Sequence, residues 1–397
     1  MFYFIFIHMR VKQNLNEVMG VPNQIKPWVD VMLAIVESTC VELIKEDEWD
    51  SGYFNYKGED GISKNYKVRL NGNHFNKLLY NTLGVSGFDG LYETKMYKDF
   101  PLFKPELEVY LNVYSDDVYF GAGLDENLEA TQKYTSGPDD VKINYEPYLT
   151  LPHIGFDFTI NMPRSKESDV ESFLNIIRPK LKSVISHELL HVYQQYKQLE
   201  GGKKSIGFGD ETILNKGTQE LRHPDLNSWN KFLHMVYLHL SFESNARVTQ
   251  LYYELKEEGF EDKKDIINKM IKSSPWLSYQ SVKDFDPKKT LNDIEGEIYE
   301  YNSNLDMYDR LGGLEMTTQK LLKAWSRAIE SDSYNFNRMG LDINQMPKVP
   351  NSAINNPIEF FDFFGKRFKK SSEKMRRKLT RVVNMLVQEK EEEEKTE

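Results

Sequence analysis

The sequence is poor in cysteine and histidine and has no long apolar run. Cys40 is the only cysteine among 397 residues, so no disulfide can form within the chain, which fits a reducing compartment. Cys40 lies in an apolar helical stretch and is interpreted as a small buried residue, not a nucleophile. No segment is long and apolar enough for a membrane helix, and residues 1–7 lack the basic region and cleavage site of a signal peptide. We therefore expect a cytoplasmic protein that does not enter a membrane.

The sequence also lacks an excess of positive charge. It has 51 lysines and arginines against 61 acidic residues, a net charge of −10, which disfavours nonspecific nucleic-acid binding by the chain as a whole. What it does have is 40% hydrophobic and 13% aromatic residues, enough for a substantial core. The length suits two or three domains, or one large domain with additions.

One short stretch carries most of the chemistry. His187, Glu188 and His191 form an H-E-x-x-H motif inside a long helical pattern. Residues four apart share a helix face, so two imidazoles could hold one zinc ion and leave coordination positions open. Glu188 could then take a proton from a zinc-bound water. The alternative interpretation is a pair of surface histidines on a helix.

A catalytic zinc site needs a third protein ligand, and Glu243 is the preferred candidate. It lies within the next long helical pattern, where Arg247 follows at a distance of one turn. A solvated Glu–Arg pair is the alternative interpretation of these two residues. Three downstream histidines are also candidates for the ligand: His223, His234 and His239.

The pairing of H-E-L-L-H with a downstream helical E-x-x-A-R resembles the zincin metallopeptidases of the gluzincin type. The resemblance covers about residues 140–255 and implies that His187, His191 and Glu243 bind zinc while Glu188 is the general base. It implies a zinc metallopeptidase, a hydrolase that cleaves peptide or protein substrates. It also implies a sheet before the motif helix, with an edge strand that holds the substrate; residues 153–161 have the matching place in the chain.

The sequence departs from the family at Arg247, where members often carry an aspartate that supports a histidine ligand. Five residues could stabilise the oxyanion, and the sequence does not choose between them: Tyr237, His239, Tyr301, Tyr308 and Arg310.

The expected fold class is α+β. A zincin-like core would contain a mixed, mostly antiparallel sheet, followed by the motif helix and a second ligand-bearing helix, with an additional helical region at the C-terminus. The expected divisions are an N-terminal α+β region at 1–103, the core at 104–260, a helical region at 261–345, and a basic helix with an acidic tail at 346–397.

Apolar periodicity and turn residues predict the individual elements. Strands are expected at 53–56, 66–70, 107–114, 118–120, 141–145 and 153–161. Helices are expected at 26–45, 75–83, 169–177, 179–200, 227–258, 263–271, 316–330 and 358–389, the third and fourth possibly continuous through Pro179. Loops or linkers are expected at 121–140, 201–226 and 332–357.

The C-terminal helix is strongly basic. Residues 366–381 contain nine lysines and arginines against one acid, Glu373, and Phe368, Met375 and Val382 recur at a spacing of seven. The preferred interpretation is a helix packed on its own domain with a solvated basic face; nucleic acid or an acidic partner is the other possibility. The run from Glu389 to the end is expected to be disordered. The alternative to a peptidase is a structural or interaction protein on a zincin-like scaffold, for example a phage virion or assembly component.

Overall fold

The computed structural model describes residues 26–45, 62–70, 106–117, 128–134, 154–200, 221–338 and 349–395. The chain divides into two compact units. The first extends to Leu190 and also contains Tyr252–Phe260; the second contains His191–Leu251 and Glu261–Glu397. Two long helices therefore each contribute residues to both units.

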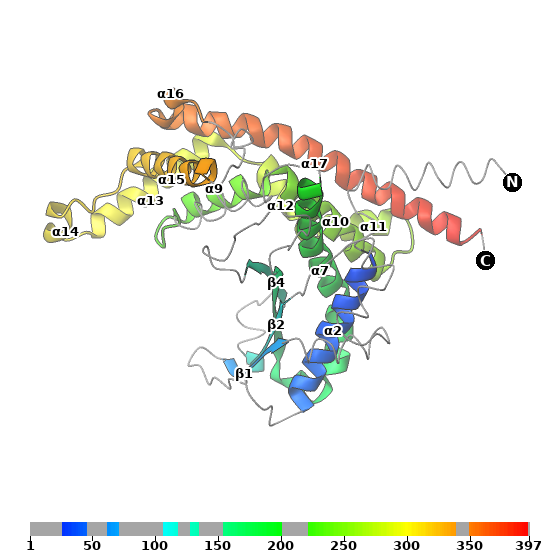
Figure 1. Ribbon diagram of the computed structural model, residues 1–397. Helices are drawn as coiled ribbons and strands as arrows, with labels where there is room; N and C mark the ends of the chain where they lie inside the picture. The colour runs from blue at the N-terminus through cyan, green and yellow to red at the C-terminus, as the bar shows by residue number, and fades with distance from the viewer. Residues whose placement is uncertain are drawn as a thin grey trace. The chain divides into compact units, whose positions relative to one another are not determined.

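The first unit contains a four-stranded mixed sheet (Figure 1). Its strands are β1 (Ile62–Leu70), β2 (Glu106–Tyr114), β3 (Leu128–Tyr134) and β4 (Ile154–Pro163), in the order β1-β2-β4-β3. The β1–β2 and β3–β4 pairs are antiparallel and the β2–β4 pair is parallel. The α+β class and the mixed, mostly antiparallel sheet are therefore confirmed.

Alternation along the strands separates an apolar face from a polar one, because successive side chains point to opposite sides. The apolar face carries fully buried residues from the two inner strands: Val109, Leu111, Val113, Phe158, Ile160 and Met162. On the other face Asn112 lies opposite Asn161 and donates an amide hydrogen bond of 3.0 Å to its side-chain oxygen. The pair satisfies part of the polar cost of burying both amides.

Two strand predictions need correction. β4 is an inner strand between β2 and β3, so residues 153–161 do not form the expected edge strand. β3 lies within 121–140, where a loop or an insertion was expected, because its polar residues Glu129, Thr131, Gln132 and Lys133 interrupt the apolar alternation. The partner of β1 is β2; residues 53–56 lie outside the described residues, as do 75–83, 118–120 and 141–145.

The described part of the first unit also contains two long helices. Helix α2 (Lys26–Lys45) begins and ends where expected, and Cys40 on its buried side is fully inaccessible. Burial raises the pKa of the Cys40 thiol, which suits the apolar interpretation. After the short helix η1 (Arg164–Asp169), helix α7 (Val170–Glu200) runs continuously through Pro179.

A partly buried lysine connects three helical segments of this unit. The Lys182 ammonium on α7 lies 2.9 Å from a carboxylate oxygen of Asp30 on α2. It lies 2.6 Å from a carboxylate oxygen of Glu257, near the end of α10 (Ser241–Glu258). These two partners raise the pKa of Lys182 against the opposing effect of burial. The lysine is therefore held charged between the helices.

The second unit is helical in its described part. Besides most of α10 it contains α9 (Asn227–Leu238), α11 (Lys263–Met270), α12 (Ser274–Lys283), α13 (Pro287–Asn304), α14 (Met307–Leu311), α15 (Thr318–Arg338), α16 (Asn351–Ile354) and α17 (Pro357–Glu393).

The single helix expected over 227–258 is wrong. The structure has two helices, α9 and α10, separated at His239 and Leu240, where no glycine or proline marks the break. Part of the expected linker is also helical, since α15 continues to Arg338 and α16 follows. Helices α12 to α14 were not expected; aspartate and serine side chains cap their first turns.

The core of the second unit is built around the ring of Phe232 on α9. Its centroid lies 4.9 Å from that of Phe361 and 5.2 Å from that of Phe364, both on α17. The expected stripe of Phe368, Met375 and Val382 is buried in the same unit. Helix α17 is thus packed on its own unit, as preferred from the sequence. The disordered acidic tail is wrong, because α17 continues through Glu393.

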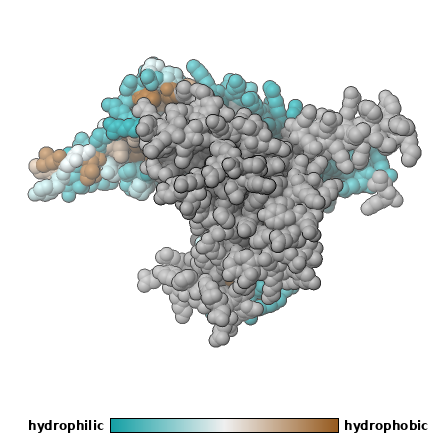
Figure 2. All heavy atoms as spheres, in the orientation of Figure 1, coloured by the Kyte–Doolittle hydropathy of each residue, from teal (hydrophilic) through white to brown (hydrophobic). Residues whose placement is uncertain are grey.

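Apolar side chains are exposed at the tip that carries α14 (Figure 2). They are Tyr299, Met307, Tyr308, Leu311 and Leu314, each more than half exposed. Across the described residues, no helix combines the length and apolar character needed to span a bilayer.

Candidate functional site

The H-E-x-x-H motif lies on α7, as the sequence predicted. His187 and Glu188 are both buried, with 6% and 9% of their surface exposed. His187 is therefore not a surface histidine, so the alternative interpretation of two surface histidines is wrong for this residue. The side chain of His191 lies outside the described residues.

The turn of α7 before the motif is buried and polar. The hydroxyl of Ser183 donates to the carbonyl of Lys180 at 2.8 Å, and that of Ser186 donates to the carbonyl of Ser183 at 2.6 Å. These bonds satisfy both hydroxyls within the helix, so they can be buried at little cost. Since α7 is continuous here, His187 and His191 share a helix face.

Glu243 occupies the first turn of α10 and is completely buried. Its Oε1 accepts a hydrogen bond of 2.7 Å from Nε of Arg247, one turn later. Its Oε2 accepts one of 2.7 Å from the hydroxyl of Tyr237 on α9. The predicted Glu–Arg pair therefore exists, but Glu243 is buried and the Arg247 side chain is only 20% exposed, so the pair is not solvated as the alternative interpretation required.

The break between α9 and α10 creates this cluster. Helix α9 ends at Leu238 and α10 begins at Ser241, so the last turn of α9 and the first turn of α10 are adjacent. Tyr237 reaches Glu243 across the break. Each carboxylate oxygen has two lone pairs, so these two bonds leave acceptor capacity for a metal ion.

The three histidine alternatives have other surroundings. The Nδ1 of His239 hydrogen-bonds the carbonyl oxygen of Val236, and its ring lies 5.1 Å from that of Phe368. Burial lowers the pKa of His239 to about 4, so it is neutral at physiological pH. His234 is exposed.

His223 is likewise engaged within its own loop. Its Nδ1 accepts a hydrogen bond of 3.2 Å from the backbone amide of Asp225. Its ring lies 5.0 Å from that of Tyr301, edge to face. Glu243 thus remains the best third-ligand candidate of the four.

The five oxyanion candidates are separated by the structure. Tyr237 contacts Glu243, whereas Tyr308 is 84% exposed. Arg310 donates to the carbonyl oxygens of Leu305 and Asn302 and so holds its own loop. The contact between Tyr237 and Glu243 could not be predicted from the sequence. It depends on the break between α9 and α10, whereas a single unbroken helix was expected there.

Among the residues described here, no group of three or more His, Cys, Asp or Glu side chains could hold a metal ion. The set of His187, His191 and Glu243 includes one side chain that lies outside them. Comparisons with protein families, with curated proteins and with solved structures found no match.

Proposed function

We propose that the protein is a zinc-dependent peptidase in which His187, His191 and Glu243 bind the metal and Glu188 is the general base. The proposal rests on the motif and on one structural observation: α7 buries His187 and Glu188 side by side. Burying two ionisable side chains is costly, and such groups gather at functional sites.

The residues present suit the chemistry of zinc. A buried histidine and a buried carboxylate are both accepted zinc ligands. A ligand must bind as the deprotonated carboxylate, and the guanidinium of Arg247 beside Glu243 is compatible with that form. Tyr237 and Arg247 would orient the carboxylate, a role that hydrogen bonds to metal ligands commonly have.

Zinc, when bound, would lower the pKa of a coordinated water and polarise the peptide carbonyl. Glu188 would accept the proton of the attacking water and return it to the departing amine. The surrounding buried residues of α7 would limit the access of other water to Glu188.

An extended substrate could pair with the outer edge of β3. This strand pairs with β4 on one side, and no other described strand pairs with its free side. Antiparallel edge strands can add a peptide as a further strand through backbone hydrogen bonds. In this proposal β3 takes the role that the sequence had assigned to residues 153–161.

The second candidate is a structural protein that does not cleave peptides. The cluster of Glu243, Arg247 and Tyr237 favours it, because both carboxylate oxygens already have protein partners. The bond from Tyr237 joins α9 to α10, and the ion pair with Arg247 compensates the charge of Glu243, so the cluster can stabilise the two helices without any metal.

Metal analysis separates the two candidates. Wild-type protein purified without a metal-affinity tag should contain about one zinc per chain. His187→Ala should lose the zinc and Glu243→Ala should weaken its retention, whereas the exposed His234→Ala is the matched control and should keep it. A wild type that stays free of zinc after reconstitution contradicts the metal proposal.

Cleavage of a mixture of fluorogenic peptides tests the peptidase step separately. Glu188→Gln should retain zinc while losing at least about 100-fold in rate, since the base is removed and the ligands are not. Cleavage at the wild-type rate would exclude Glu188 as the base. Zinc binding without any wild-type cleavage would favour the structural candidate.

A further inference from the structure

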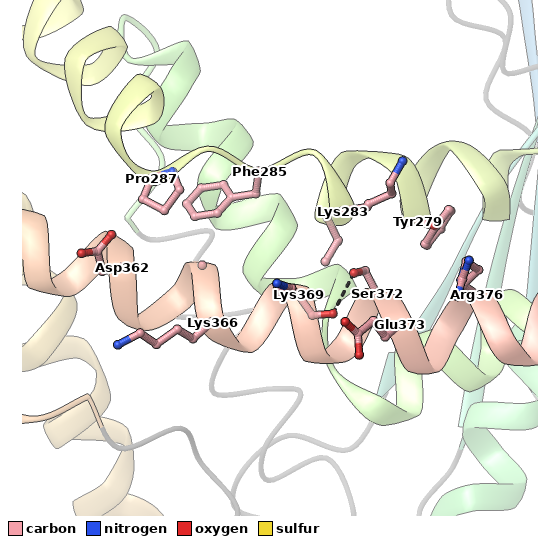
Figure 3. A pocket seen from close by; sticks show the side chains of 12 residues that line it. Tyr279, Lys283, Phe285, Pro287, Asp362, Lys366, Lys369, Ser372, Glu373 and Arg376 are labelled. Atoms are coloured by element: carbon pink, nitrogen blue, oxygen red, sulfur yellow. Dashed lines mark hydrogen bonds between the residues drawn. The ribbon is translucent and has the colours of Figure 1, made fainter.

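A groove of about 630 Å³ lies between α12 and α17 in the second unit (Figure 3). One wall comes from α12 and the turn after it, the other from α17. Four cationic side chains line it: Lys283, Lys366, Lys369 and Arg376. Two carboxylates, Asp362 and Glu373, share the lining, so the groove is basic on balance.

The basic character extends beyond the groove along α17. Lys370, Lys374, Arg377 and Arg381 are also exposed on this helix. None of the exposed cations of residues 366–381 forms an ion pair with a carboxylate in the part of the chain that the structure describes. Figure 2 shows the visible side of α17 as hydrophilic.

The positive charges of α17 act on one another. The pKa of Lys378 is lowered by burial and by the neighbouring cations Lys374 and Arg381. Like charges one turn apart destabilise a helix, so a surface of this kind is costly unless a polyanion neutralises it.

The surface is held rigid by the opposite side of α17. Phe364, Phe368 and Met375 are buried in the core of the unit. At Gly365 an added Cβ would lie 2.7 Å from Cγ of Pro287, so α17 closely approaches the wall of the groove. The cations therefore project from a fixed support about 22 Å long over residues 366–381, at 1.5 Å per residue.

We propose that this groove and the basic face of α17, residues 366–381, bind the sugar–phosphate backbone of nucleic acid without reading its sequence. A row of phosphates matches a row of fixed cations and releases condensed counterions on binding. Exposed pairs with flexible glutamates of an acidic protein contribute much less.

The same geometry indicates contact with the backbone and not with the bases. The groove is lined by two aromatic rings, and neither is a free platform for a base: Tyr279 is only 5% exposed, and Phe285 packs edge to face against Phe368, with 4.8 Å between ring centroids. One side of α17 is packed against its own unit, so the helix forms a wall. The inference does not depend on the metal site.

Binding is measured by fluorescence anisotropy with the full-length protein and labelled 20-nucleotide probes of random sequence: duplex DNA, single-stranded DNA and single-stranded RNA. Reversal of three groove cations, Lys366→Glu, Lys369→Glu and Arg376→Glu together, should weaken binding about tenfold or more at low salt. It should also make the dependence of log K on log salt less steep, by about two to three in slope.

A matched control reverses three exposed cations elsewhere in the second unit: Lys264→Glu, Lys323→Glu and Arg327→Glu. This control changes the net charge equally and should bind the probes much as the wild type does. Equal weakening by both triple variants would show that net charge alone matters and would overturn the proposal. Circular dichroism and thermal unfolding verify that both variants are folded.

Polyglutamate of matched charge is the competitor that distinguishes the other class of partner. It should displace the oligonucleotides poorly. Displacement at equal charge concentration would assign the surface to an acidic protein, and no binding of any probe by the wild type would also overturn the proposal. Comparison of the three probes shows which form of nucleic acid fits the groove best.

Discussion

The two compact units use charged residues differently. In the first unit, ionisable side chains lie inside or between the helices: Lys182 is partly buried beside Asp30 and Glu257, and the motif residues His187 and Glu188 are buried. In the second unit, the main hydrophobic cluster consists of apolar and aromatic side chains, and the lysines and arginines of α17 are mostly outside.

The exception in the second unit is instructive. Glu243 is fully buried at the α9–α10 break, although this unit otherwise has apolar side chains inside and charged ones outside. A buried carboxylate must be compensated by partners, and here Arg247 and Tyr237 supply them. Charge therefore lies mostly on the surface of α17, whereas α7 and α10 also carry ionisable side chains inside the packed structure.

The largest expected effect concerns the aromatic core of the second unit. Phe232→Ala should lower the free energy of unfolding by about 3–5 kcal/mol, because it removes the ring around which several others pack. Urea unfolding measures the change. Leu277→Ala, at a site 53% exposed, is the control and should change stability by less than about 0.5 kcal/mol.

The cluster around the buried Glu243 can be disrupted by replacing Arg247. Arg247→Met should destabilise the protein by about 3 kcal/mol, because the buried Glu243 loses its guanidinium partner. If Glu243 is a zinc ligand, added zinc should restore part of this loss, since a ligand that binds only the folded state stabilises it. Unfolding with and without zinc measures both, and Arg327→Met, at an exposed site, is the control. Identical losses in both conditions would speak for the structural candidate.

Two glycines test how closely α17 is packed. Gly365→Ala should destabilise the protein by about 1–3 kcal/mol, because the new Cβ would clash with Pro287. Gly296→Ala in the middle of α13 meets nothing within 4 Å and should stabilise by about 0.5–1 kcal/mol through helix propensity. Thermal unfolding of the two variants should therefore shift in opposite directions; a shift in the same direction would contradict the close contact at Gly365.

The smallest expected effect depends on pH and concerns Glu254 of the first unit. Burial, and then repulsion from Glu258, raises its pKa from 4.5 to about 7, against an opposing effect of Lys180. The folded state therefore holds a proton that the unfolded state releases, so this group reduces stability as pH rises from about 4.5 to 7.

Glu254→Gln removes that pH-dependent loss. The variant should be more stable than the wild type at pH 8, by on the order of 1 kcal/mol, and the difference should vanish near pH 4. Unfolding measured across this pH range tests the sign. Glu300→Gln, at an exposed site, should follow the wild type at every pH; a Glu254→Gln variant that did the same would refute the raised pKa.

Helices with a clear apolar period were predictable from the sequence. Helix α2 lies where expected, α7 carries the motif, and α17 buries the stripe that recurs every seven residues. Such patterns are local, because one turn of a helix brings together residues that are close in the chain. The break at His239 was missed for the same reason: the apolar pattern continues across it without a breaking residue.

Sheet order could not be obtained in this way. The pairing of β4 with β2 and β3 joins segments far apart in sequence, and the weak alternation of β3 concealed it. An inner strand and an edge strand can carry similar patterns, so residues 153–161 alone did not reveal which they would form.

The sequence by itself determined the motif of His187, Glu188 and His191, the helices that carry it, and the basic composition of residues 366–381. These features depend on residue identity and local spacing. The tertiary structure alone decided that Glu243 is buried with Arg247 and Tyr237, and that the cations of α17 line a groove with Lys283. Burial and the meeting of separate helices arise from long-range packing, whose free energy no local pattern contains.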